Sequence, residues 1–330
     1  MDKKKIFTWK NSIIAFGFLI AALYPPLSGN SYIIHIGLLF FIWSVVASSW
    51  NLLNGYCGII SLGNVSFLVL GSYISAILVK QFAISPWLAI LLAGVGTSLL
   101  VTVLLGFPAL RLKGIYIALM TLIFSDTLSP ILTQSREITG GRMGLHAVPP
   151  FFPGMEKVHA YFLCLLLFLV AHFVIYRVIH SSTGLAFITL RDSEAFAMSI
   201  GVNFFNERLK VFAISSFITG IAGGFYIHSL GDISPTTLGI EPFLMGIAMM
   251  EFGGIGTFLG PVLGAFVIVF GGEFLRLADT LRLSLVGALI CLTILFFPGG
   301  AMQLVENLSR IVKNRIAGQR SKKVINNIAP

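Results

Sequence analysis

Three ionisable side chains stand inside long apolar runs of this chain, and they are its first candidates for chemistry. Asp126 follows the apolar run 115–124, Glu251 comes two residues before Gly253, and His228 lies near the end of the run 209–229. A charge near the centre of a bilayer costs at least ~2.5 kcal/mol, so such a residue usually faces a cavity or a partner. Each could assist the passage of a polar solute or an ion, or lie at an interface where the cost is lower.

The patterns that predict catalysis or a bound metal are missing from the sequence. Cys57, Cys164 and Cys291 stand alone, without a C-x-x-C pair or metal-ligand spacing. There is no H-E-x-x-H, no G-x-S-x-G and no Gly-Lys dipeptide, so the sequence has no phosphate-binding loop for ATP. We therefore expect no catalytic residue, no cofactor and no metal, and a membrane-embedded enzyme lacks support.

Glycine recurs at every fourth position late in the chain. Gly256, Gly260 and Gly264 follow the pair Gly253-Gly254. On a helix this spacing places three missing side chains on one stripe, where another helix backbone can approach closely. In a soluble helix each glycine would cost roughly 1 kcal/mol relative to alanine, whereas close packing offsets that cost in a membrane. The stripe predicts tightly crossed membrane helices.

The segment 54–73 begins with polar and small residues, although it leads into an apolar span. Ser61, Gly63 and Asn64 lie within it. Backbone that leaves helical geometry at membrane depth must be surrounded by protein or line a water-filled cavity. The segment is therefore either a broken helix whose amide groups face the pathway of a polar or anionic solute, or a packing face of small residues.

The stretch 181–210 is too polar to cross a membrane. Between Gly184 and Gly201 it predicts a short amphipathic helix that ends at a glycine, with Arg191, Asp192 and Glu194 clustered in mid-course. Such a helix can rest on the membrane surface or dock into a groove of a partner protein, and its residues alone favour neither.

The composition predicts a membrane protein of many helices. The 330 residues are 56% hydrophobic and only 11% charged, which is too little charge for an ordinary soluble domain of this length. Several apolar runs reach the ~20 residues that cross a bilayer. We expect an all-α polytopic membrane protein of about 8–10 transmembrane helices, half-helices included, at 11–28, 31–52, 59–79, 86–107, 115–134, 158–180, 209–229, 241–255, 257–276 and 283–302.

Lys and Arg are distributed unequally between the two sides of this arrangement. With the N-terminus in the cytoplasm, most of the 22 Lys and Arg residues fall on the cytoplasmic side, which places both termini there. This orientation accounts for the net charge of +9 without a nucleic-acid partner. We expect a cytoplasmic N-terminus 1–10, a transmembrane domain 11–302 with a cytoplasmic loop 181–208, and a basic tail 303–330 near anionic membrane lipid.

Five motifs in fixed order resemble one family of membrane proteins. They are G-Y-x-G-x-x-S-L-G at 55–63, G-I-Y-x-A at 114–118 with an acid shortly after it at Asp126, T-G-G-x-x-G-L at 139–145, the loop 191–201, and G-G-x-G-T-x-x-G-P-x-x-G-A at 253–265 after Ser234-Pro235. Over roughly residues 35–300 the chain resembles the permease subunits of bacterial ABC importers for branched-chain amino acids, specifically the M-type member of the permease pair.

The resemblance implies a set of partners in the bacterial inner membrane. They are a second homologous permease subunit, which makes a heterodimer, two cytoplasmic ABC ATPase subunits, and an extracytoplasmic solute-binding protein. The resemblance favours ATPase docking for the cytoplasmic loop, through Arg191, Asp192, Glu194, Ala195 and Gly201. The residues expected to serve the translocation path or its helix packing are Ser61, Gly63, Asn64, Asp126, Glu251, Gly254, Gly256, Gly260 and Gly264.

Three positions depart from the family pattern. The family commonly has Gln at Ile59, His or Gln at Asn64, and an apolar residue at Glu251. Because these positions lie in segments that could line the path, the solute stays open between branched-chain amino acids, urea, short amides and other small polar molecules. An ion-coupled secondary transporter that uses Glu251 or Asp126 is the alternative from a different class.

Overall fold

The computed structural model describes residues 30–275 together with residues 287 and 300. Within these residues every regular element is a helix, and the isolated antiparallel bridge between Leu145 and Ile233 is the one β contact. The prediction of an all-α membrane protein is confirmed. The expected span 11–28, and all but two residues of the span 283–302, lie outside the described residues.

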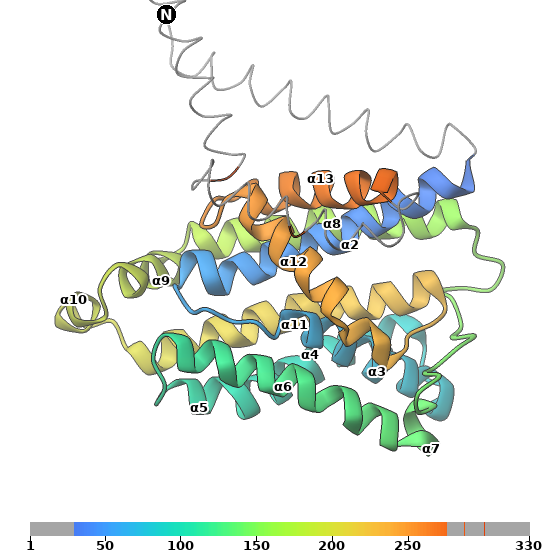
Figure 1. The fold of residues 1–330 in the computed structure, drawn as a ribbon, viewed down its shortest axis with the longest axis horizontal. Helices are drawn as coiled ribbons and strands as arrows, with labels where there is room; N and C mark the ends of the chain where they lie inside the picture. The colour runs from blue at the N-terminus through green and yellow to red at the C-terminus, as the bar shows by residue number, and fades with distance from the viewer. Residues whose placement is uncertain (1–29, 276–286, 288–299, 301–330) are drawn as a thin grey trace, which may run out of the picture.

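Six helices in the described part of the chain are long and apolar enough to cross a membrane. They lie side by side along the length of the molecule (Figure 1). Two of them change geometry near one end, since α2 continues through a π-helical turn at Leu52–Tyr56, and α4 continues through a second one at Thr102–Gly106 into α5. The bounds are α2 (Ser31–Asn51), α3 (Asn64–Phe82), α4 (Pro86–Val101), α5 (Phe107–Ala109), α6 (Ile115–Gln134), α8 (Lys157–Ile179) and α11 (Phe204–Leu230).

Five of the expected spans coincide with these helices to within a few residues. The span expected at 59–79 is wrong at its start, because α3 begins only at Asn64 and residues 57–63 before it are not helical. Side chains of neighbouring helices hydrogen-bond to this irregular backbone, so the chain can leave helical geometry without leaving those backbone groups unpaired.

The helices α2, α3 and α11 form the centre of the bundle. A Cβ placed on Gly71 of α3 would lie 2.6 Å from the Gly220 Cα of α11, and Ser72 Oγ donates to the Gly223 carbonyl oxygen at 2.8 Å. The most apolar stretches of α2 and α11 are 78% and 72% buried, whereas those of α4, α6 and α8 are 39%, 33% and 33% buried. The outer helices therefore carry apolar surface of the kind that faces lipid or another subunit.

Two shorter helices, α12 (Ile240–Gly253) and α13 (Gly260–Leu275), form a hairpin. With 14 residues α12 is about 21 Å long, which is less than the thickness of the hydrocarbon core. The expected segments 241–255 and 257–276 are thus two helices, the first of them short. The chain reverses between them at residues 254–259.

The crossing of α12 and α13 is as close as the glycines predict. A Cβ on Gly264 would overlap the Met249 carbonyl oxygen, and a Cβ on Gly253 would overlap the Gly260 carbonyl oxygen. The prediction of a single three-glycine stripe is wrong for Gly256, because this residue lies in the non-helical reversal and not on a helix.

Two short helices, α9 (Ser182–Asp192) and α10 (Glu194–Ser199), stand at one end of the bundle, which we term the inner end because the distribution of Lys and Arg predicts that it faces the cytoplasm. The expected single helix from Gly184 to Gly201 is wrong in two respects. It starts earlier, at Ser182, and it breaks at Ser193, which is extended and whose hydroxyl accepts from the Phe196 N–H to cap α10. The prediction that the helical segment ends at a glycine is confirmed, since Gly201 follows α10 with φ of 87°.

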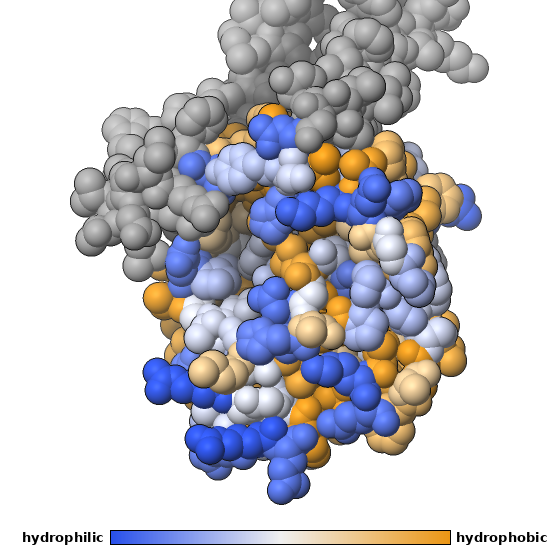
Figure 2. All heavy atoms as spheres, turned by 90° about the vertical axis from the view of Figure 1, so that its right-hand side faces the viewer, coloured by the Kyte–Doolittle hydropathy of each residue, from blue (hydrophilic) through white to orange (hydrophobic). Residues whose placement is uncertain are grey.

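The opposite, outer end carries α7 (Arg136–Thr139), the following loop to residue 156, and a 3-10 turn at Pro235–Leu238. Figure 2 looks onto this end and shows mainly hydrophilic and intermediate residues across it, with hydrophobic residues toward its margins. Lys80 at the end of α3 donates to the His146 carbonyl oxygen at 2.8 Å and ties the loop down. His228 does the same from α11, since its ring contacts the Pro149 carbonyl oxygen at 2.7 Å.

Candidate functional site

The backbone is irregular over residues 57–63, between the π-helical turn that continues α2 and the start of α3, where the sequence predicts either a broken helix or a packing face. Two side chains of the preceding helical segment replace the missing helix bonds. Trp50 Nε1 donates to the Ser61 carbonyl oxygen at 2.7 Å, and the Ser61 N–H donates to Asn54 Oδ1 at 2.9 Å. These bonds give the backbone of the segment the partners that it needs at membrane depth.

The small and polar residues of this segment are buried. Ser61 and Asn64 are fully shielded, and Ser61 Oγ donates to Asn64 Oδ1 at 3.1 Å. The Leu62 N–H donates to Thr121 Oγ1 of α6 at 2.9 Å, and a Cβ on Gly63 would lie 2.8 Å from the Thr121 carbonyl oxygen. This geometry corresponds to the packing alternative, while contact of these residues with a solute stays a prediction.

A second break lies at residues 254–259, between α12 and α13. Gly254 has φ of 108° and Gly256 has φ of 77°, which are backbone conformations that residues with a Cβ rarely adopt. Asn51, the last residue of α2, joins the two breaks. The Gly256 N–H donates to Asn51 Oδ1 at 2.8 Å, and Asn51 Nδ2 donates to the Thr257 carbonyl oxygen at 2.8 Å. The motifs at 55–63 and 253–265 therefore meet at one place.

Arg191 of α9 reaches the same place from the inner end. Its Nη1 donates to the Gly55 carbonyl oxygen at 2.9 Å, and its Nε and Nη2 donate to Asp192 Oδ1 at 3.0 Å each. The aliphatic part of Arg191 packs on Gly58, whose absent Cβ would lie 2.7 Å from Arg191 Cγ. Helix α9 is thus attached directly to the end of α2.

Glu194 of α10 provides a second attachment. It accepts from Arg208 Nη2 at 2.5 Å, and the Arg208 side chain is 8% exposed. Arg208 Nη1 donates to the carbonyl oxygens of Ala109 and Leu112 at 2.9 and 3.1 Å, next to the C-terminus of α5. Arg191 and Glu194 therefore bind other residues of this chain, Gly55 and Arg208. The sequence did not predict these contacts.

The outward surface of the cytoplasmic pair is apolar. Leu185, Phe196, Met198 and Ile200 are 66%, 59%, 56% and 57% exposed. Three of them lie on or just after α10, which projects from the bundle in Figure 1. Ala195 is exposed as well. The exposed residues 185, 195, 196 and 198–200 are called the α10 tip below, and Ala197, which lies between them, is buried.

The two intramembrane carboxylates have different surroundings. Asp126 lies on the outward face of α6, which also exposes Ile115, Leu119 and Ile123. Glu251 is half-buried on α12, one turn before Gly254. Neither carboxylate has a hydrogen-bond or ion-pair partner among the described residues. Each is a candidate for contact with a solute, water or a second subunit.

His228 differs from these carboxylates because it is satisfied within the fold. Its side chain is 1% exposed, and its Nε2 lies 2.9 Å from Ser75 Oγ while its Nδ1 contacts the external loop. A structural role accounts for it. The described residues contain no cluster of three His, Cys, Asp or Glu that could hold a metal ion.

A hollow of about 360 Å³, with a mixed and mainly apolar lining, opens near the outer end. Three segments of the chain line it, namely the end of α6, the T-G-G loop and the 3-10 turn with the start of α12. Its one cationic residue is Arg142, which is exposed and has no hydrogen-bond or ion-pair partner among the described residues. The lining residues are Ser129, Thr133, Arg142, Pro235, Thr236, Leu238 and Gly239.

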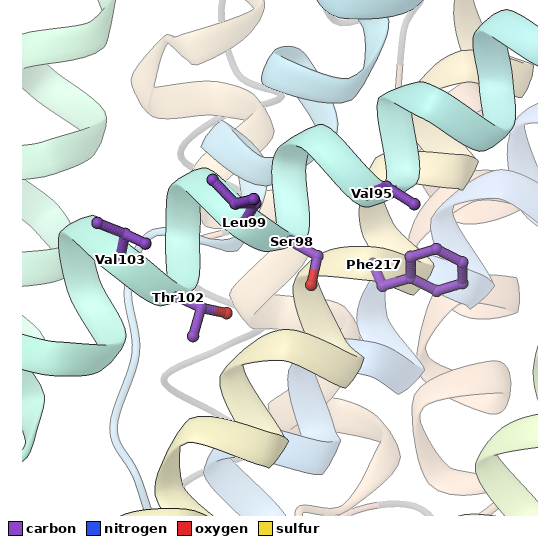
Figure 3. A pocket seen from close by; sticks show the side chains of 6 residues that line it. All are labelled: Val95, Ser98, Leu99, Thr102, Val103 and Phe217. Carbon is purple, nitrogen blue, oxygen red and sulfur yellow. The ribbon is translucent and has the colours of Figure 1, made fainter.

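A second hollow, of about 320 Å³, has a different character. Figure 3 shows that its side chains come from one side of α4 and its π-helical turn, with Phe217 added from α11. Leu99 and Val103 are 61% and 49% exposed, and Ser98 Oγ already donates to the Ala213 carbonyl oxygen at 2.9 Å. This groove belongs to the apolar outer surface and not to the two breaks.

Sequence reasoning missed two residues that organise the site. Asn51 stands four positions before the G-Y-x-G motif, and its amide is the one signal that could have drawn attention to it, although Ser48, Ser49 and Asn54 are polar neighbours in the same run. Arg208 was counted only as a cytoplasmic charge. Its burial could not be read from the sequence, because its partners at 109, 112 and 194 belong to three other segments.

Comparison with known proteins gives one consistent result. Residues 32–297 match the family described as the permease component of the branched-chain amino acid transport system. The chain is 26% identical over 341 residues to the high-affinity branched-chain amino acid transport system permease protein LivM of Salmonella typhimurium, covering 95% of this chain and 80% of that protein. The corresponding LivM protein of Escherichia coli is 25% identical with the same coverage.

A more distant relative extends the comparison. The chain is 26% identical over 269 residues to the probable branched-chain amino acid transport permease protein LivM of Methanocaldococcus jannaschii, covering 70% of this chain and 78% of that protein. No solved structure matches the chain.

Proposed function

The chain belongs to the family of branched-chain amino acid transport permease components, and from this premise we propose that it forms half of the membrane path of an importer for leucine, isoleucine and valine. The other half is a homologous permease subunit, and two ATPase subunits drive the cycle from the cytoplasmic side of the bacterial inner membrane. This chain itself hydrolyses nothing.

The observation that carries the proposal is the attachment of the α9–α10 pair. Arg191 binds the end of α2, Glu194 binds α11 through Arg208, and the apolar α10 tip remains exposed beyond them. A helix that only rests on lipid needs no polar attachment to the helices behind it. A helix that transmits force from an ATPase needs both an outward docking face and firm inward attachments. The arrangement supports docking over the membrane-surface alternative.

The unpartnered carboxylates support a second subunit. Asp126 lies on an outward helix face, where lipid would be a costly neighbour, and Glu251 is half-buried near the second break. A facing permease subunit, with the solute path between the two subunits, would supply water or polar groups to both. We therefore assign Asp126 and Glu251 to the path or its walls.

The outer hollow supports an anionic or zwitterionic solute. Arg142 offers a cation, and Ser129 and Thr236 offer hydroxyl groups, at the end of the bundle where a solute-binding protein would deliver its cargo. The carboxylate of an amino acid suits this lining. Urea and simple amides lack that charge, so the hollow favours amino acids among the solutes that the sequence leaves open.

Purification of the tagged chain from its own membranes tests the proposal. The complex, placed in lipid vesicles with its solute-binding protein, should hydrolyse ATP faster when leucine is present and should accumulate labelled leucine inside. Uptake of urea or acetamide in preference to leucine would overturn the substrate assignment. Uptake driven by a proton or sodium gradient without ATP would replace the importer with an ion-coupled transporter.

A further inference from the structure

We propose that Asn51 is a positioning residue that clamps the two helix breaks together, so that movement of α9 reaches both breaks at once. The inference rests on the proposed function, because it explains how the cytoplasmic loop acts on the path. Neither the sequence motifs nor the family resemblance assigns a role to Asn51.

The clamp is built from three elements that meet within hydrogen-bond distance. Asn51 ends α2, is 2% exposed, and uses both ends of its amide on the second break, with Gly256 and Thr257 at 2.8 Å each. One turn later, the Gly55 carbonyl oxygen accepts from Arg191 Nη1 at 2.9 Å. One helix end therefore binds the reversal 254–259 on one side and the cytoplasmic helix on the other.

Gly55 and Gly256 lack side chains, so their backbones contact each other directly. A Cβ on Gly55 would overlap the Gly256 backbone nitrogen, and a Cβ on Gly256 would lie 3.3 Å from Arg191 Nη1. The two glycine motifs thus have a shared reason for their glycines at this point, which is the close approach of their backbones and the guanidinium. A larger residue at either position would separate the three elements.

The amide of Asn51 is the part of this contact that cannot be replaced by packing. The break 254–259 lacks a continuous set of helix hydrogen bonds, and the amide supplies an acceptor to its Gly256 N–H and a donor to its Thr257 carbonyl. If α9 moves with an ATPase, Arg191 moves the Gly55 carbonyl, and the amide then moves the second break with it. Without the amide, α9 would move the first break alone.

The matched variants are Asn51→Leu, which keeps the size and removes both bonds, and Arg191→Gln, which removes the guanidinium at a partly exposed site. Ser49→Ala on the same helix is the control, because it removes a buried hydrogen bond to Thr219 without touching either break. In the released arrangement the amide of residue 51 no longer holds the reversal 254–259. Losing two buried hydrogen bonds should raise the equilibrium ratio of released to clamped protein by roughly 10- to 30-fold.

The principal readout is the number of ATP molecules hydrolysed per leucine transported by the complete complex in vesicles. A merely structural role would lower hydrolysis and uptake together, in proportion to the amount of assembled complex. The clamp predicts that Asn51→Leu and Arg191→Gln each raise this ratio severalfold, that their effects do not add, and that Ser49→Ala leaves it unchanged. An unchanged ratio in assembled Asn51→Leu complex overturns the proposal. If Asn51→Leu does not assemble, the Arg191→Gln ratio decides in the same way.

A second readout separates this proposal from the proposed function. Spin labels at the exposed positions Ile60 and Ile255, in a background without the native cysteines, report the distance between the two breaks. A narrow distance distribution that broadens in Asn51→Leu supports the clamp, and an equally narrow one in the variant overturns it. This measurement needs no transport, so it still decides the clamp if the wild-type complex proves to carry no branched-chain amino acid.

Discussion

Truncation of Glu194 to alanine tests whether the cytoplasmic helices are anchored from within. In the structure Glu194 does not point toward a partner protein, because it accepts from Arg208 Nη2 at 2.5 Å. The Arg208 side chain is 8% exposed and that of Glu194 is 33% exposed, so the pair is shielded on one side only. Glu194→Ala would leave the guanidinium with its two carbonyl partners near the end of α5 and without its counter-charge.

The size of the effect follows from these surroundings. Removing one member of a fully buried ion pair costs about 3–5 kcal/mol, and a hydrogen bond to a charged group contributes about 1.5–3 kcal/mol. Because Glu194 is partly exposed and Arg208 keeps two acceptors, we expect a cost at or below the smaller of these values, about 1–2 kcal/mol. This cost falls on the placement of α10 and leaves the membrane helices folded.

Two measurements follow for Glu194→Ala. Thermal unfolding in detergent should be only slightly earlier than for wild type, whereas leucine-stimulated ATP hydrolysis in the assembled complex should fall by roughly 5- to 30-fold, the factor that corresponds to 1–2 kcal/mol. Asp192→Ala is the matched control, because Asp192 is 64% exposed and its pair with Arg191 is of the kind that contributes at most about 1 kcal/mol. Equal hydrolysis in the two variants would refute the anchoring role of Glu194.

Four further changes probe other parts of the site. Gly260→Leu forces a side chain into the α12–α13 crossing, where even a Cβ would lie 2.6 Å from the Gly254 carbonyl oxygen, so assembly measured by size-exclusion yield should fall with a cost of ~1–3 kcal/mol or more. Phe196→Ala should weaken ATPase binding, measured by titration, about 10- to 30-fold if the α10 tip is the docking surface. Arg142→Gln should raise the KM for leucine uptake about tenfold, because a charged hydrogen bond to the carboxylate is lost. Glu251→Gln should alter uptake or its dependence on pH between roughly 5 and 8 at unchanged protein level, because it removes a charge from the path.

The chain offers matched controls for these changes. Gly271 lies on the same helix as Gly260 but has no described residue within 4 Å of its missing Cβ, so Gly271→Leu should assemble normally. Leu99→Ala removes a side chain that is exposed on α4 and is not part of the α10 tip, so it should leave ATPase binding intact. Arg136→Gln removes an outer cation that does not line the hollow. Transport by Glu251→Gln that equals wild type at every pH would exclude a path role for Glu251.

Much of the membrane architecture could be predicted because it depends on length, hydropathy and small residues. Apolar runs of about 20 residues become spanning helices since no other arrangement satisfies their backbone within a bilayer. The glycines at 220, 223 and 264 lie at close helix crossings, because only a residue without a side chain leaves room for the neighbouring helix. Hydropathy could not predict the start of α3 at Asn64, because residues 57–63 are as apolar as a helix and side chains elsewhere hydrogen-bond to their non-helical backbone.

The candidate site was predictable in its motifs but not in its connections. Spacing identified 55–63, 191–201 and 253–265 as separate segments, and nothing in that spacing indicates that the Gly55 carbonyl, the Arg191 guanidinium and the Gly256 amide lie together. A broken helix exposes backbone groups that any suitable donor or acceptor can satisfy, and many polar residues along a sequence could do so. Only the fold selects Asn51 among them. The residues that join functional segments in a membrane protein are therefore those whose polar groups lack a local helical explanation, and Asn51 and Arg208 are two examples at the inner end.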